Sequence, residues 1–186
     1  MNWAFFKNDA PRFFNEVEQF LLELNIFDAV SKLEADHFGL RFGNPDTVTA
    51  VSQELRNEGT MIASAEVNGR QIQIIELAQP LVIGNRQIQC IELPYPKQNN
   101  TYSDGWEHVE FVIPSNAETL DTFRAVCTST LPNLDWDHLR ASPIYSESVP
   151  SGDNDQRTNP TIALEKSKNL TIKFHPASIR TIVTGA

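Results

Sequence analysis

Two stretches in opposite halves of the chain share one design, and this repetition constrains the fold more than any other feature of the sequence. The stretch 107–114 alternates as a strand does, with His108 on a polar face and large apolar side chains on the other face. The stretch 36–42 is built in the same way around His37. Two strands that each place a histidine among polar neighbours predict two similar halves around one polar cleft.

The segments after each stretch extend the repetition. The first half continues with a helix at 45–57 and strands near 60–66, 70–77 and 86–93. The second half continues with a helix at 116–129 that starts from a capping-box pattern at Ser115, a strand at 134–140, a polar loop at 141–159, and strands at 161–165 and 170–175. Both halves therefore have the predicted order β-α-β-β-β.

The first 34 residues stand outside this repetition. Asp9 and Pro11 have the pattern of a helix start, and apolar residues at helical spacing follow them. A second helical piece is expected at 26–34. We therefore expect a single domain with a helical extension at 1–34, a first module at 35–96, a linker at 97–104 and a second module at 105–186, which ends in a short helix after Pro176.

Composition excludes several classes of partner. The formal net charge is −9, which argues against a nucleic-acid binder and against attraction to anionic lipid. No apolar run approaches the roughly 18 residues that span a membrane, and the N-terminus lacks the features of a secretory signal. The two cysteines, Cys90 and Cys127, have no metal-binding spacing and do not suggest a disulfide framework. These features favour a cytoplasmic protein that binds a small molecule and not nucleic acid or membrane, and they leave the oligomeric state open.

The order and spacing of several short segments together resemble the YecM-like family, part of the vicinal-oxygen-chelate superfamily with glyoxalase I, extradiol dioxygenases and bleomycin-resistance proteins. The segments are 35–37, 68–70, 91–94, 105–108, 159–161 and 172–176. The resemblance implies an α+β fold in which paired β-α-β-β-β modules form a curved mixed sheet, or open barrel, around one cleft. It implies a fold and a kind of site, and not a particular reaction.

The resemblance also implies where a divalent metal ion would bind, because enzymes of the superfamily take metal ligands from the first and last strands of each module. His37, Glu92 and His108 match three of these positions. The fourth position, where a glutamate is usual, holds Lys173, which cannot be a ligand while it is protonated. We therefore expect His175, two residues further along the same strand face, to supply the fourth ligand. Such a ligand set suits zinc, iron, nickel or manganese without choosing among them.

Other side chains on the same faces have candidate roles. Glu110, which shares the face of His108, is the candidate general base. Arg41 and Lys173 are candidates for binding an anionic substrate, although Arg41 is as readily explained by a structural ion pair. Cys90 fits a small buried apolar residue better than a nucleophile.

Each candidate ligand also has a simpler explanation. His37 and His108 could be hydrogen-bonded strand histidines, and His175 could precede a helix start at Pro176. Glu92 has a near-copy in Glu76, which fits a solvated face. The fourth histidine, His138, lies between aspartates and fits the surface.

Two classes of function follow. The first is a metal-dependent lyase, isomerase or oxygenase that acts on a small oxygen-bearing molecule. The second is a non-catalytic binding protein that uses the same cleft, and Lys173 at a usual glutamate position is its best support.

Overall fold

The computed structural model describes residues 2–97, 102–153 and 155–186. The predicted linker at 97–104 and the loop at 141–159 therefore lie partly outside the described residues. The elements of the first half are β1 (Glu34–Arg41), α3 (Pro45–Glu58), β2 (Gly59–Val67), β3 (Arg70–Ile83) and β4 (Arg86–Pro94). The elements of the second half are β5 (Gly105–Val112), α4 (Leu120–Thr130), α5 (Trp136–Arg140), β6 (Tyr145–Ser148), β7 (Thr161–Ser167) and β8 (Leu170–His175).

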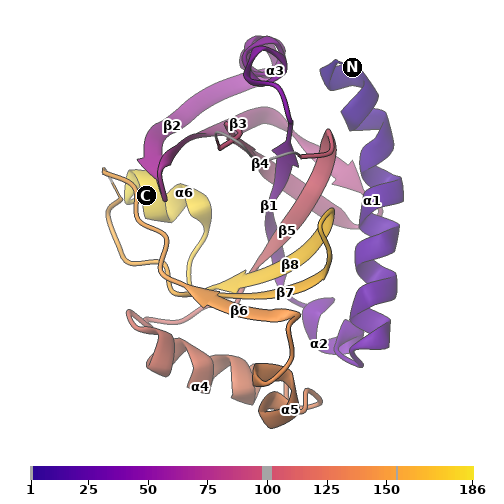
Figure 1. Cartoon of the computed structure of the whole chain (residues 1–186), viewed down its shortest axis with the longest axis vertical. Helices are drawn as coiled ribbons and strands as arrows, with labels where there is room; N and C mark the ends of the chain where they lie inside the picture. Colours follow the sequence, from indigo (N-terminus) through magenta and orange to yellow (C-terminus); the bar gives the residue numbers. More distant parts are fainter. Residues whose placement is uncertain (1, 98–101, 154) are drawn as a thin grey trace.

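All these strands belong to one mixed sheet, in the order β2-β3-β4-β1-β5-β8-β7-β6. In each half the first strand pairs in parallel with the last, β1 with β4 and β5 with β8. The two halves meet where β1 and β5 pair antiparallel. The sheet curves around a central space without closing, with α3 and α4 on its outer side (Figure 1). The expected α+β fold with a curved mixed sheet is therefore confirmed.

The seam between β1 and β5 is supported from outside by α1 (Trp3–Glu23). The rings of Phe38 on β1 and Phe13 on α1 meet edge to face at 5.4 Å, and Trp106 on β5 stacks on Phe13 at 6.2 Å. The indole Nε1 of Trp106 also donates to the carbonyl oxygen of Phe6 at 3.1 Å. All four side chains are buried, so aromatic packing fixes the strands that carry His37 and His108 on their other face.

The N-terminal helix is longer than the sequence predicted. It begins at Trp3, where the side chain of Asn2 accepts a hydrogen bond from the backbone of Phe5, and Pro11 lies inside it. The predicted start at Asp9 is therefore wrong. The second piece is only the single turn α2 (Phe27–Val30), because β1 already begins at Glu34.

The second half differs from prediction in its helices. The α4 helix starts after Thr119, which forms a capping box with Thr122, and not after Ser115. The predicted strand at 134–140 is wrong, since this segment contains α5. The Asp135 side chain caps α5, and its buried residues, Trp136 and Leu139, are three apart as on one face of a helix.

The β7 strand pairs with β8 on one side and with β6 on the other, and β6 lies inside the predicted loop. The last helix, α6 (Ile179–Thr184), lies within the curve of the sheet (Figure 1). No helix in the described parts of the chain has the length and apolar character needed to cross a bilayer.

Candidate metal centre

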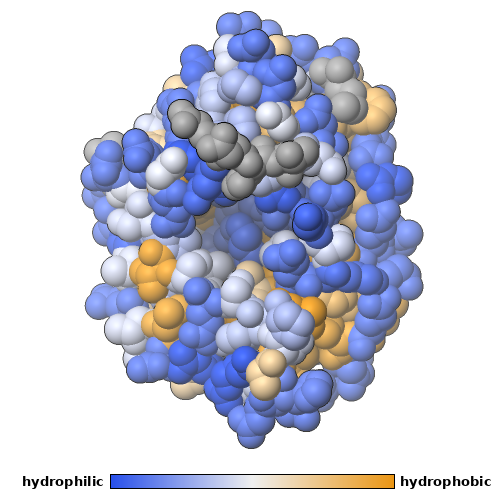
Figure 2. Space-filling model, viewed as in Figure 1, coloured by the Kyte–Doolittle hydropathy of each residue, from blue (hydrophilic) through white to orange (hydrophobic). Residues whose placement is uncertain are grey.

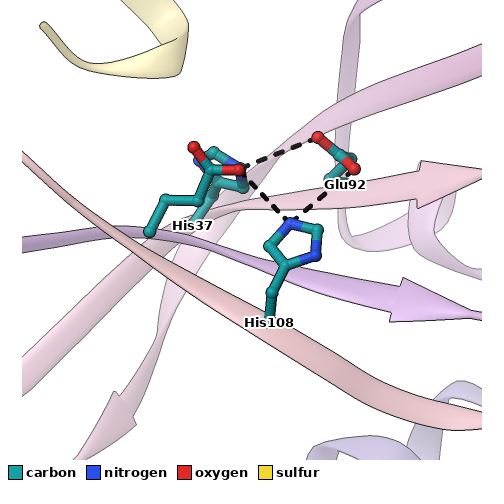
Figure 3. Close-up of side chains that lie close together, drawn as sticks. His37, Glu92 and His108 are labelled. Carbon is teal, nitrogen blue, oxygen red and sulfur yellow. Dashed lines mark ion pairs between the residues drawn. The ribbon is translucent and has the colours of Figure 1, made fainter. Parts of the chain in front are cut away.

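The seam brings four side chains from three adjacent strands to one point. They are His37 on β1, Glu92 on β4, and His108 and Glu110 on β5, and all four are buried. One ligand atom from each lies within 4.8 Å of the others, so together they could hold a metal ion. Figure 3 shows the two imidazole rings and the Glu92 carboxylate turned toward one another.

Within this group, one ring nitrogen of each histidine lies close to the carboxylate oxygens of Glu92 and Glu110. The Nε2 atom of His37 lies 3.3 Å from Oε1 of Glu110 and 3.8 Å from Oε2 of Glu92. The Nε2 atom of His108 lies 3.5 Å from Oε1 of Glu110 and 3.7 Å from Oε1 of Glu92. Each imidazole thus faces both carboxylates through the same ring nitrogen.

The other ring nitrogen of each histidine is held by the acidic residue that precedes it. Nδ1 of His37 lies 2.7 Å from Asp36, and Nδ1 of His108 lies 2.6 Å from Glu107. A carboxylate at Nδ1 holds a proton on that nitrogen, so Nε2 is the atom of each ring that would meet an ion. This is the arrangement that protein metal sites use to orient their histidines.

Each of these acids is aimed by a β-bulge. In the β1–β5 pairing Ala35 is opposite Phe111 and His37 is opposite Glu110, so Asp36 is an extra residue on β1. Between the pairs Gly39–His108 and Leu40–Trp106, Glu107 is likewise an extra residue on β5. A bulge turns a side chain that would otherwise face away, and bulges are common beside functional sites.

Polar atoms left unpaired are the strongest sign that the group holds something. The Nε2 atoms of His37 and His108 are buried and make no hydrogen bond to any described residue. A buried polar atom without a partner is costly and calls for an explanation. A metal ion at this point would use both lone pairs, so the residues present fit a divalent cation.

Gly39 makes room for one of the two rings. A Cβ atom at this position would lie 2.0 Å from Cε1 of His108, so the imidazole rests directly on the backbone of β1. Any other residue here would displace His108.

The charge balance of the cluster points to a cation as well. Four carboxylates, of Asp36, Glu92, Glu107 and Glu110, surround the two rings, and the basic side chains paired with them are Lys173 and Arg41. Burial opposes protonation of His37, but the negative charges of Glu110 and Asp36 outweigh it and raise the pKa of His37 to about 10. The metal-free protein therefore compensates part of its buried negative charge with a proton.

Lys173 is part of this balance. Its Nζ donates to Oε1 of Glu110 at 2.8 Å. Burial by itself would raise the pKa of Glu110, but the positive charge of Lys173, with that of His37, holds this pKa well below its usual range. Glu110 is therefore an ionised carboxylate.

His175 lies next to the cluster, in a second group with Asp36 and His37. Its Nε2 is 3.3 Å from Oδ2 of Asp36, and its Nδ1 is 3.8 Å from Oε2 of Glu110. Burial lowers the pKa of His175, so its ring is neutral. The structure thus places Glu110, the predicted base, in the group of four, and places the predicted ligand His175 beside it.

The remaining candidates are spread around the site. The guanidinium of Arg41 lies 3.5 Å from Glu107, donates to the carbonyl oxygen of Lys168 and covers the ring of Tyr102. Burial raises the pKa of the Cys90 thiol to about 12, so Cys90 is a neutral buried residue. His138 is exposed on α5, as predicted.

Three residues that matter here were missed by the sequence reasoning: Asp36, Glu107 and Gly39. A signal for the first two was present, because an acidic residue directly precedes each strand histidine. Simple alternation assigns these acids to the opposite face, and the bulges that reverse them leave no mark in the sequence.

On one face the molecule is hollowed at its centre, and hydrophilic residues lie within the hollow (Figure 2). The view is that of Figure 1, in which β1 and β5 cross the middle of the curved sheet. The fold and the site together define an α+β protein with two β-α-β-β-β halves and a buried histidine–carboxylate cluster at their junction.

Comparisons with known proteins place this chain in a family. The family model described as YecM protein matches residues 4–185, so the chain belongs to the YecM family. It is 31% identical to Protein YecM of Escherichia coli strain K12 over 95% of this chain and 89% of that protein. It is 30% identical to an uncharacterized protein of Haemophilus influenzae, over 92% of this chain and 88% of that one. A solved structure, the structural-genomics protein EC4020, matches with a TM-score of 0.75 and 31% identity over 98% of this chain and 91% of that one.

Proposed function

We propose that this protein is a divalent-metal-binding enzyme of the vicinal-oxygen-chelate type that acts on a small oxygen-bearing molecule. One observation carries the proposal. Two buried Nε2 atoms without hydrogen bonds from described residues face two carboxylates, with one ligand atom from each of the four residues within 4.8 Å of the others. Zinc, iron, nickel and manganese all accept imidazole and carboxylate ligands.

We assign the ligands to His37, Glu92, His108 and Glu110. This set keeps three of the ligands expected from the sequence and replaces His175 with Glu110. The reason is geometric, because Glu110 has a ligand atom within 4.8 Å of those of His37, Glu92 and His108, whereas His175 belongs to a separate group with Asp36 and His37. Both ring nitrogens of His175 are also buried without hydrogen bonds from described residues, and its Nε2 lies 3.3 Å from Oδ2 of Asp36, so we place His175 beside the ligands.

A bound ion would supply Lewis acidity toward a substrate oxygen. The chain's own residues prepare the surroundings. Asp36 and Glu107 hold the protons of the two histidines on Nδ1. Lys173, whose side chain is 23% exposed, places a positive charge at the edge of the cluster and can attract an anionic oxygen. A lyase, an isomerase and an oxygenase are all compatible with this arrangement.

The first experiment is elemental analysis of protein purified without chelator, followed by metal titration of the stripped protein. We expect near-stoichiometric transition metal, and uptake of one ion per chain after stripping. No metal in the purified protein and no uptake on titration would refute the proposal.

The ligand assignment is tested by two matched substitutions. Glu110→Gln keeps the size of the side chain and removes the charge, so we expect metal affinity to fall by more than about a hundredfold. The His175→Gln variant should still bind the ion, with metal affinity reduced by about tenfold at most. The opposite order of effects would restore His175 as the ligand. Circular dichroism of both variants checks that the fold is retained.

A non-catalytic binding protein is the second candidate, and the pairing of Lys173 with Glu110 favours it. An ammonium at 2.8 Å from one carboxylate supplies positive charge that an ion would otherwise supply. If metal-free protein gains thermal stability from small organic anions and chelators do not change this, the binding role is preferred.

A further inference from the structure

A second, apolar cavity lies inside the curve of the sheet, beside the metal-binding group. Its volume is about 230 Å³. An engineered cavity of about 150 Å³ in another protein binds benzene, so this space can take a somewhat larger apolar group. Its floor is formed by small and branched side chains of β2 and β3, and α6 forms a wall. These residues include Ala63, Ala65, Ile72, Ile74, Ile179 and Val183.

The strand register connects this cavity to the candidate metal centre. Glu92 on β4 is directly opposite Ile74 on β3, and Ile74 is opposite Ala63 on β2. Residues opposite each other in antiparallel strands share a face of the sheet. The cavity floor therefore begins one strand away from a proposed metal ligand and lies on the same face.

The wall formed by α6 is also tied to the metal-binding group. The backbone N–H of Ile179 donates to Oδ2 of Asp36 at 2.8 Å, and Asp36 is the acid that orients His37. The side chain of Ile179 lines the cavity. One residue thus touches both sites, which fixes the cavity relative to the cluster.

Polar residues also contribute to the lining of this cavity. Asn159 lines it and is buried, and its Oδ1 accepts no hydrogen bond from the residues that the structure describes. Asp155, also in the lining, uses Oδ2 to accept the backbone N–H of Gly152. A carboxylate in the lining disfavours an anionic group here, whereas Lys173 places a positive charge beside Glu110 in the metal-binding group.

We infer that this cavity holds the apolar part of the substrate while its oxygen atoms reach the metal ion. The inference rests on the proposed function and adds a substrate class. The substrate is a small amphiphile with adjacent oxygen atoms at one end and an apolar body, somewhat larger than a benzene ring, at the other.

The test uses metal-loaded protein and two hydroxamates, which bind metals through adjacent oxygens. Acetohydroxamate reaches only the ion, and hexanohydroxamate adds a chain for the cavity. We expect hexanohydroxamate to bind on the order of a hundredfold more tightly in calorimetry, since each buried methylene tightens binding by about fourfold. Equal affinity of the two compounds would overturn the inference and leave the metal proposal intact.

A substitution that fills the cavity sharpens the test. Ala65→Leu adds bulk to the floor and should remove the preference for hexanohydroxamate without changing the affinity for acetohydroxamate. Glu66→Leu is the matched control, because Glu66 is the next residue on β2, is exposed, and points to the opposite face. A preference that survives Ala65→Leu would count against the inference.

A metal-free arm separates failure of the cavity from failure of the metal site. If neither hydroxamate binds to protein loaded with any of the tested metals, the metal proposal fails. Binding of hexanol to metal-stripped protein then tests the cavity independently of the metal site. A higher melting temperature with hexanol in the unsubstituted protein, and none in Ala65→Leu, supports the cavity. No shift in either protein overturns it.

Discussion

The two halves of the sheet orient their histidines in the same way but supply their carboxylates differently. In the first half, β1 carries Gly39 two residues after His37, and β4 carries Glu92 opposite it. In the second half, β5 carries Glu110 two residues after His108, and β8 carries Lys173 opposite it. Each half thus brings one carboxylate to the cluster, from its last strand in the first half and from its first strand in the second.

This difference gives the second half a lysine where the first half has a carboxylate. Lys173 on β8 holds the place that Glu92 holds on β4, and the second half's carboxylate is Glu110 on the neighbouring strand, where the lysine neutralises part of its charge. The first half cannot carry a carboxylate at the matching position on its first strand, because the ring of His108 occupies the space above Gly39. In both halves the preceding acidic residue orients the histidine. The halves differ in which strand supplies the carboxylate near the ring.

The largest expected effect comes from Gly39→Ala, which removes the space on which this comparison depends. The added Cβ would lie 2.0 Å from His108, so the ring must leave its place. We expect unfolding free energy to fall by about 1–3 kcal/mol and metal binding to be lost. Urea unfolding and metal titration measure the two effects.

A second substitution shows whether the clash is the cause. Gly39→Ala combined with His108→Ala removes the ring that the methyl group meets, so much of the lost stability should return while metal binding stays absent. The two changes are in contact and should be strongly non-additive. Additive losses would show that Gly39 matters for another reason.

The next largest effect is expected when the carboxylate of the second half is moved from β5 to β8, which makes the second half resemble the first. Glu110→Gly alone removes a proposed ligand and should weaken metal binding by more than about a hundredfold. Adding Lys173→Glu returns a carboxylate on β8, as in the first half, and should bring the affinity back to within about tenfold. Glu110→Gly with Lys173→Met is the control, and recovery of binding there would contradict the assignment.

A smaller effect is expected from the acids that orient the histidines. Asp36→Asn and Glu107→Gln should each reduce metal affinity by about 10–100-fold, measured by competition with a chromophoric chelator. The two variants should differ in stability. Asp36 also accepts the backbone N–H of Ile179 and contacts His175, whereas Glu107 pairs with Arg41 at 3.5 Å. We expect Asp36→Asn to lower the melting temperature more, and the reverse order would refute this difference.

Alternation in the sequence was enough to predict two similar halves and to place His37 and His108 on the polar faces of their strands, and the family resemblance added Glu92. It works because a regular strand has a period of two and because the opposite face, with Phe38 and Phe111, is strongly apolar. The predicted starts of two helices were wrong, because more than one nearby residue can cap each helix. Asp9 has the form of an N-cap, yet aromatic packing continues the helix to Trp3.

The composition of the site was less predictable than its location. Glu110 and His175 both lie near the two histidines, and only coordinates show that Glu110 and not His175 belongs to the group of four. The bulges at Asp36 and Glu107 are set by the pairing of two strands that are distant in sequence. A single-strand pattern therefore contains no information about them.

A last effect distinguishes the halves by the pH dependence of metal binding. Below the His37 pKa of about 10, the metal-free protein holds a proton on His37 that an ion must displace. Apparent metal affinity should therefore rise roughly tenfold per pH unit between about pH 7 and about pH 9, with release of one proton from this residue. Calorimetry in two buffers of different ionisation enthalpy measures that proton.

Asp36→Asn removes one of the charges that raise the His37 pKa, so its proton release near pH 8 should shrink, whereas Glu107→Gln acts on the other histidine and should leave it unchanged. Equal proton release in both variants would show that the proton is not held by the first half of the site.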